Sequence, residues 1–382
     1  GTEVVNVVKA YTPTIRDAFK VKATPQLNDS ITTAKKKVTY SIFSVPVAST
    51  FTPAKGKAAV VKKAKKEKLY DNYATLGFGS FTSVLAEFYS NFQISRTEDF
   101  GVFLNHNSSQ GGIDGTVVDD FFYDSRLNLN YGARERDLTW RADLDAKHQV
   151  YNWYGIPEEL KELQGPADGP LFTEDFDVTH SYLTAGLNGS ISLKDSFFKE
   201  ATGMVRYFGD DLESTELRAV VAPTVEFPIA GELITTKLSV DYLSGSFANS
   251  FGTTGTEINY SFLNAGINPS LVILRDDLEV KLGVEGVVSL DTENSETDFF
   301  IYPKIAASYR VAGDYFIAYG GLEGGLVQNN YHDFAQENPF ISPTLIVAPT
   351  NKQYDGFLGM KGKLSEALSY NLRASYASES GK

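Results

Sequence analysis

Four histidines and no cysteine limit the chemistry available to this chain of 382 residues. Without cysteine, disulfides, thiolate metal sites and cysteine nucleophiles are all excluded. The histidines are far apart in the sequence, and no HExxH, GxSxG, GxGxxG or P-loop motif occurs. We therefore expect no enzyme, no cofactor and no metal site. The histidines are His106, His148, His180 and His332.

One short cluster could still be arranged as a hydrolytic site. Thr179, His180 and Ser181 follow the acidic residues Asp175 and Asp177. A single histidine among polar residues near the end of a strand is more often solvated or hydrogen bonded than catalytic. The acidic segment that precedes it also lacks the ligand spacing of a calcium-binding loop. We therefore expect the histidine to be solvated or hydrogen bonded and the acidic segment to be a solvated loop.

The formal net charge of -13 argues against a nucleic-acid partner, because phosphate binding needs a basic face. Charged residues instead alternate with apolar ones, as in LTWRADLDAK from residue 138. A period of two is typical of a strand with one polar and one apolar face. These runs reach the length of about 9 to 11 residues that a tilted strand needs to cross a bilayer.

If the apolar positions face lipid, the polar positions face the interior of a barrel, where charge costs little. Opposed charges on neighbouring strands could brace the barrel or select a polar solute, and bracing is the interpretation we favour. The residues predicted to face the lumen are Arg141, Asp143, Asp145, Lys147, Glu279, Lys281, Glu285, Lys361, Lys363 and Arg373.

The predicted connections alternate between short turns and long polar segments, as in outer-membrane barrels. Short turns are expected at residues 134–137, 230–233, 275–277, 312–314 and 365–367, and long segments at 107–120, 152–175, 245–256, 291–297 and 328–338. Aromatic residues at strand ends, among them Tyr151 and Trp153, predict girdles at the two membrane interfaces.

We count about fifteen strands from Leu69 onward and expect strands only. Because bacterial single-chain barrels normally have an even number of strands, and because the chain ends SESGK, we expect it to be part of a longer barrel. The predicted fold is an all-β, transmembrane, antiparallel up-and-down β-barrel of about 16 strands or more, incomplete at the C-terminus.

A resemblance supports this fold. The run KLYDNYATLGFGSFTSVLAEFYSNFQISRTEDFGVFLNHN from Lys68, followed by SSQGGIDG and HQVYNWYGIPE, resembles outer-membrane barrel proteins of Bacteroidota that are similar to TonB-dependent receptors. The resemblance extends to YDGFLGMKGKLSEALSYNLRASYASE and so covers most of the chain. It implies an outer-membrane address in a Gram-negative bacterium. Receptors of this class carry a folded plug before the first strand, whereas only residues 1–68 precede it here.

The N-terminal letters resemble the TonB box of such receptors, which would bind TonB by β-strand addition. An apolar terminal strand that docks inside its own barrel or on a neighbouring protein would have the same kind of sequence. The residues concerned are Thr2, Glu3, Val4, Val5, Val7 and Val8.

The expected organisation is a periplasmic or lumenal N-terminal extension at residues 1–68, with a Lys-rich linker, and a barrel at residues 69–382. The first expected function is passage or uptake of a polar solute, receptor-like or porin-like. The alternative is a non-enzymatic structural subunit of an outer-membrane assembly or secretion complex. Expected partners are outer-membrane lipid and lipopolysaccharide, with TonB or other outer-membrane subunits.

Overall fold

The computed structural model describes residues 39–41, 70–116, 118–155, 177–250 and 256–381. The chain divides into two units, Gly1–Lys66 and Glu67–Lys382. The second unit contains all the helices and strands described below.

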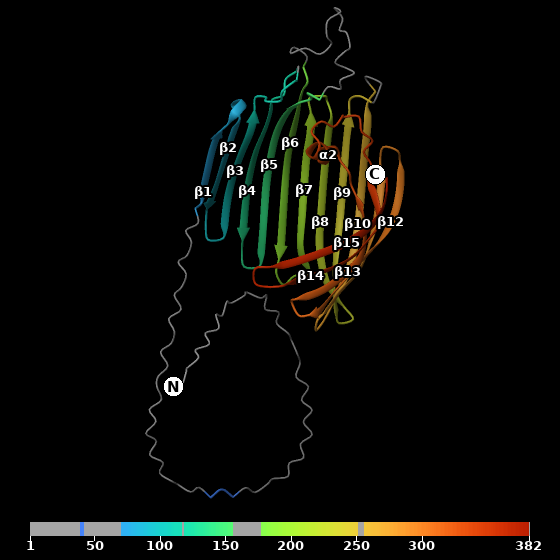
Figure 1. Ribbon diagram of the computed structural model, residues 1–382. Coiled ribbons are helices and arrows are strands. Elements are labelled where there is room, and N and C mark those ends of the chain that lie inside the picture. Colours follow the sequence, from blue (N-terminus) through green and yellow to red (C-terminus); the bar gives the residue numbers. More distant parts are fainter. Residues whose placement is uncertain (1–38, 42–69, 117, 156–176, 251–255, 382) are drawn as a thin grey trace, which may run out of the picture. The chain divides into compact units, whose positions relative to one another are not determined.

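This second unit is one antiparallel sheet of fifteen strands, which follow one another in sequence order (Figure 1). The predicted all-β up-and-down architecture and the predicted count are therefore confirmed. Within the described residues, no pairing joins β15 to β1. The strands are β1 (Asn72–Phe78), β2 (Val84–Gln93), β3 (Glu98–Ser109), β4 (Phe122–Arg134), β5 (Leu138–Asn152), β6 (Thr179–Leu193), β7 (Phe198–Asp210), β8 (Thr215–Ile229), β9 (Glu232–Phe247), β10 (Ile258–Arg275), β11 (Leu278–Asp291), β12 (Glu296–Ala312), β13 (Phe316–Val327), β14 (Thr350–Lys363) and β15 (Ser369–Ser380).

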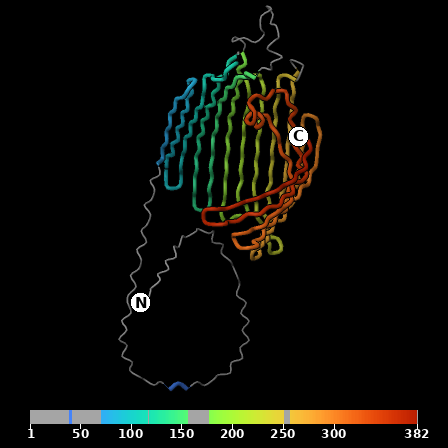
Figure 2. Tube along the Cα trace, in the orientation of Figure 1, coloured from blue at the N-terminus to red at the C-terminus, as the bar shows by residue number. Residues whose placement is uncertain are grey.

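The sheet curls strongly. In Figure 2 the first strands lie side by side, and the last strands, coloured orange to red, turn across the view. The expectation of strands only was wrong, because a short 3-10 helix η1 (Ser80–Thr82) and an α-helix α2 (Tyr331–Glu337) interrupt the strands. In the described part of the chain, neither helix has the length and apolar character needed to cross a membrane.

On one rim of the sheet the connections are all short, as predicted. This rim holds every second connection, beginning with β2–β3 and ending with β14–β15, and each has two to five residues. The two-residue turn between β8 and β9 has positive φ at both Ala230 (52°) and Gly231 (89°), as a tight hairpin requires. The opposite rim is mixed. The predicted long segment at residues 291–297 is a tight turn, because β11 and β12 pair up to Asp291 and Glu296.

The register assigns each residue to one of two faces, since directly paired residues of an antiparallel sheet point to the same side. We call the face that contacts α2 the inner face and the other the outer face. The outer face is apolar and exposed; examples are Leu144 (47% exposed), Leu187 (54%) and Val221 (54%). An apolar surface of this extent indicates that the outer face is covered by something other than water.

The buried core lies on the inner face, between the sheet and the connection that joins β13 to β14. Tyr182, Phe208, Leu243 and Phe247 from the strands pack around Tyr331 of α2. The ring of Tyr331 meets Phe247 edge-on at a centroid distance of 4.9 Å. The connection at residues 328–349 is therefore part of the folded core.

The two faces give a first test. We expect Leu144→Lys to cripple assembly of the barrel in membranes, because a lysine facing lipid costs about 2 to 4 kcal/mol at the midplane. Asp143→Asn, one position away on the inner face, should leave assembly unchanged. The heat-modified shift of the folded band on a gel measures both variants. Equal tolerance of the two would reverse the assignment of the faces.

Candidate functional site

The candidate site is built around α2, which its own sequence defines. The Asn330 side chain accepts a hydrogen bond from the Asp333 backbone N–H at 3.0 Å and donates one to the Asp333 carboxylate at 2.6 Å. This is a helix N-cap with a reciprocal side-chain contact. The helix ends at Glu337, before Asn338 and Pro339, and proline near this point cannot continue a helix. The helix is thus locally encoded.

A buried carboxylate from the sheet fixes the start of this helix. Glu216 of β8 is 2% exposed, and its carboxylate accepts hydrogen bonds from the backbone N–H groups of Tyr331 (2.6 Å) and His332 (3.3 Å). The Tyr260 hydroxyl of β10 donates a third at 2.9 Å. The unpaired amides of the first helical turn thus find their acceptor in the barrel wall.

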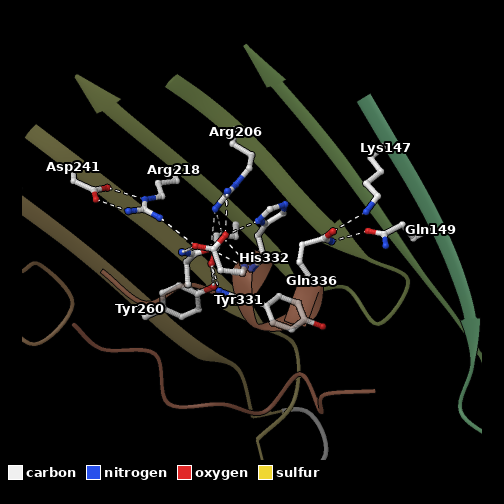
Figure 3. Close-up of polar contacts among 12 residues, drawn as sticks. Lys147, Gln149, Arg206, Arg218, Asp241, Tyr260, Tyr331, His332 and Gln336 are labelled. Atoms are coloured by element: carbon white, nitrogen blue, oxygen red, sulfur yellow. Dashed lines mark hydrogen bonds and ion pairs between the residues drawn. The ribbon is translucent and has the colours of Figure 1, made fainter. Parts of the chain in front are cut away.

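Two arginines surround this contact (Figure 3). Arg206 of β7 donates to Asn330 at 2.8 Å and to Asp333 at 3.3 Å. Arg218 of β8 forms a bidentate pair with Asp241 of β9, at 3.0 and 2.7 Å, and lies 3.6 Å from Asp333. Bidentate pairs of this kind are among the stronger charge-assisted hydrogen bonds. The network joins three neighbouring strands to α2.

A second anchor lies at the other end of the helix. Gln336 accepts a hydrogen bond from Lys147 and donates one to Gln149, both at 2.7 Å (Figure 3). Beyond the helix, the carbonyl of Pro339 accepts hydrogen bonds from the Trp153 indole (3.2 Å) and the Tyr182 hydroxyl (2.8 Å). The connection is therefore held from β5 through β10.

A polar cavity of about 420 Å³ lies between α2 and the wall formed by β4 to β7. Volumes of this order are typical of small-molecule sites. Two atoms of its lining residues, Thr184 Oγ1 and Arg206 Nε, are buried without a hydrogen-bond partner. Gly186 occupies the position between Asp145 and Arg206 in the register and leaves the space open. The cavity could hold a small polar ligand that supplies the missing partners.

The charges around the cavity largely cancel. Arg126 forms a bidentate pair with Asp145 at 3.0 and 2.7 Å, and Lys147 lies 3.1 Å from Asp124. A strongly charged ligand would have to break such a pair, whereas a neutral polar one would not. Within the described residues, no group of three or more His, Asp or Glu side chains is placed to hold a metal ion.

The register places all ten residues predicted to face the lumen on the inner face. Within the described residues, none of the ten pairs with another. Asp145 and Lys147 contact Arg126 and Gln336, and Glu285 of β11 pairs with Lys304 of β12 at 2.8 Å. Arg373 lies over the Phe357 ring at 4.0 Å, and Lys361 lies over the Tyr319 ring at 5.7 Å. The rest, Arg141, Asp143, Glu279, Lys281 and Lys363, are assigned to this face by the register.

Three other predicted features have different outcomes. The segment resembling a TonB box, Thr2 to Val8, lies outside the described residues. His180 is on the inner face, 2.6 Å from Asp211, whereas Ser181 is on the outer face, so the two do not form a dyad. The predicted girdle residue Trp153 instead contacts Pro339, because the connection at residues 328–349 covers this end of β5.

Sequence reasoning missed the residues that dock α2, although part of the signal was present. Glu216 and Arg218 alternate with Leu217 and Ala219, the same period of two that identified residues 138–147. Asn330 and Pro339 are separated by the length of a short helix. Glu216 meets Tyr331 only because the long connection after β13 folds back onto the sheet, and no local sequence pattern shows where this connection makes contact.

The hydrogen bonds of Asp333 set its ionisation. Burial opposes the charge, yet the contacts with His332 and Asn330 and the nearby Arg206 hold the pKa of this carboxyl well below its usual range. The Asp333 side chain is 56% exposed, so the effect on stability is reduced by solvent screening. Asp333 is therefore charged whenever the rest of the network is folded near neutral pH.

We expect Glu216→Ala to release α2 from the wall, because it leaves the backbone N–H groups of Tyr331 and His332 without their acceptor and removes the negative charge near Arg206. The expected loss is about 3 kcal/mol. Denaturant titration followed by the fluorescence of Trp153, which contacts the same connection, measures it. Glu226→Ala is the matched control on β8, since Glu226 pairs with Lys199 at the surface of the sheet at 3.2 Å. Equal losses for the two variants would contradict the docking role.

The pKa of Asp333 predicts a pH dependence. A carboxyl whose pKa is lowered on folding stabilises the folded form above the unfolded pKa, near 3.9, and loses this effect as pH falls through the folded value. Wild type should therefore be more stable than Asp333→Asn at pH 7, and the difference should shrink below about pH 4. The same Trp153 titration at a series of pH values tests this. A difference that grows in acid would contradict it.

Comparisons with known proteins agree with this fold. No protein-family model and no curated protein matches the sequence. Among solved structures, the chain is similar to Pseudomonas aeruginosa FpvA bound to heterologous pyoverdines (TM-score 0.57, 12% identity, 81% of this chain and 48% of that one). It is also similar to the ferric-catecholate import receptor Fiu of E. coli K12 (TM-score 0.54, 11% identity, 80% of this chain and 58% of that one). A third similar structure is the siderophore receptor PirA of Acinetobacter baumannii (TM-score 0.53, 11% identity, 81% of this chain and 52% of that one). The chain spans about half the length of these structures, and its fifteen-stranded antiparallel sheet resembles their barrels in fold.

Proposed function

We propose that this chain belongs to an outer-membrane β-barrel of a Gram-negative bacterium that passes or takes up a polar solute, in the manner of a TonB-dependent receptor or a porin. The observation that carries this proposal is the contrast between the faces. The outer face is apolar and exposed, while the inner face bears a charged network around a polar cavity. In lipid, such a sheet buries its apolar face and keeps its polar face in a wet lumen.

The fold supports the uptake class over an enzyme, because the similar structures are described as receptors for siderophores or ferric catecholates. The solute in this protein is proposed to be polar and not strongly charged, because the ion pairs around the cavity already cancel. The ten inner-face charges are proposed to brace the lumen. TonB is the proposed energising partner of residues 2–8, and residues 1–68 are proposed to be the periplasmic or lumenal extension.

One observation favours the second candidate, a structural subunit of an outer-membrane assembly. The connection at residues 328–349 packs into the core of the inner face and hydrogen bonds to β5, β6, β7, β8 and, through Asn264 and Gln328, to β10. A lumen blocked in this way would suit a barrel that serves as a scaffold. The two candidates therefore differ in whether this connection moves.

A reversible tether distinguishes them. Because the chain has no cysteine, Gln149→Cys with Gln336→Cys places two unique thiols where the native side chains meet. For a transporter, we expect a reducible thiol crosslinker to lower single-channel conductance and swelling of liposomes in polar solutes, and reduction to restore both. Gln149→Cys alone is the control and should not respond.

The opposite results are equally informative. Conductance that persists unchanged in the crosslinked protein would place the connection outside the solute path. A barrel that is silent in every state and that co-purifies with defined outer-membrane proteins would replace transport with the structural role.

A further inference from the structure

The outer face of β3 to β5 carries a polar row beside apolar ones. His106 of β3, Ser125 of β4 and His148 of β5 are direct neighbours in the register. His106 lies between two hydroxyls, with Nδ1 2.8 Å from Ser125 Oγ and Nε2 3.1 Å from Ser108 Oγ. His148 is exposed, and its ring lies 6.1 Å from that of Tyr123. Polar side chains on a lipid-facing surface are costly and often functional.

The row borders a groove of about 440 Å³ on the same face. The next row toward the short-turn rim consists of Phe88, Leu104, Leu127 and Ala146, and each of these side chains lines the groove. The small side chain of Ala146 leaves room beside Leu127. The groove is thus apolar on the side toward the short turns and is bordered by the polar row on the other side.

The level of the row matches the edge of an apolar band. Below it, toward the short turns, the outer face of β3 to β5 continues through Val102, Leu129 and Leu144. Above it, Tyr123 stacks with Phe121 at 6.1 Å, near the start of β4. Aromatic residues of this kind mark the interface where lipid headgroups lie.

The two rows of the outer face that line the groove carry no acidic side chain, although the chain as a whole has a net charge of -13. The row itself consists of Ala86, His106, Ser125, His148 and Leu183, and the row below it also contains no carboxylate. The outward side chains of the row therefore offer hydroxyl and imidazole groups without a nearby negative charge. Phosphate oxygens accept hydrogen bonds, and such donors suit them.

From this arrangement we propose that the outer face binds one phosphate-bearing membrane lipid, with an acyl chain in the groove and the headgroup phosphate on His148 and Ser125. Ser125 and His106 are not proposed as a catalytic pair, since the row's backbone amides lie within paired strands. The inference rests on the membrane location in the proposed function but not on transport. A barrel that conducts normally and binds no lipid would overturn this inference alone.

The test uses the whole chain folded in detergent and native mass spectrometry to count bound lipid. The probes are dioleoylphosphatidylglycerol and dioleoylglycerol, which share acyl chains and differ in phosphate. We expect wild type to retain one molecule of the phosphatidylglycerol at least fivefold more strongly than the diacylglycerol. His148→Leu with Ser125→Ala should abolish this preference, and Ala146→Phe should abolish retention of both lipids.

Thr215→Val with Ser246→Ala is the matched control. These two residues form another polar pair on the outer face, with hydroxyl oxygens 3.3 Å apart, outside the groove. Binding should survive in this control, and the heat-modified gel shift verifies that each variant is folded. Because His148 is exposed, His148→Gln alone provides a second variant that does not endanger folding, and it should weaken the preference.

Equal retention of the two lipids by wild type would overturn the proposal. So would an unchanged preference in the folded His148→Leu, Ser125→Ala variant. Displacement of the lipid by excess inorganic phosphate would assign the row to a free anion instead of a lipid.

Discussion

The alternation of side chains along paired strands is the constraint on which the rest of this structure depends. From β1 to β12, registry is broken only near Phe198, so the side of almost every residue is fixed by its place in the ladder. A slip of one position would move a whole row of charges into the apolar face. The polar cavity, the docked helix and the outer groove all result from this division.

On the inner face, Glu216 has a special place. A buried carboxylate without partners would be strongly unfavourable, and here the amides of α2, the Tyr260 hydroxyl and nearby Arg206 supply them. The helix needs an acceptor for its first amides, and the wall needs donors for its buried acid. Each therefore satisfies the other, which explains why a helix of seven residues is stable in this position.

Much of the fold was predictable because its signals are local. Alternation in residues 138–147 and turn residues such as Ala230 and Gly231 identify strands and hairpins without reference to distant parts of the chain. The face of each charged residue follows from the same alternation. The partners did not follow: Asp145 meets Arg126, and Lys147 meets Gln336 189 residues away. Such pairs depend on strand register and on the path of a long connection, which composition does not encode.

The connection that covers the inner face is joined to the wall at both ends, since β13 ends at Val327 and β14 begins at Thr350. It cannot diffuse away as a separate domain could. Any release of α2 is a unimolecular swing, and the freed helix stays at an effective concentration in the millimolar range beside its own docking residues. Reclosure after such a release would therefore need no second molecule, because the docking residues stay beside the helix.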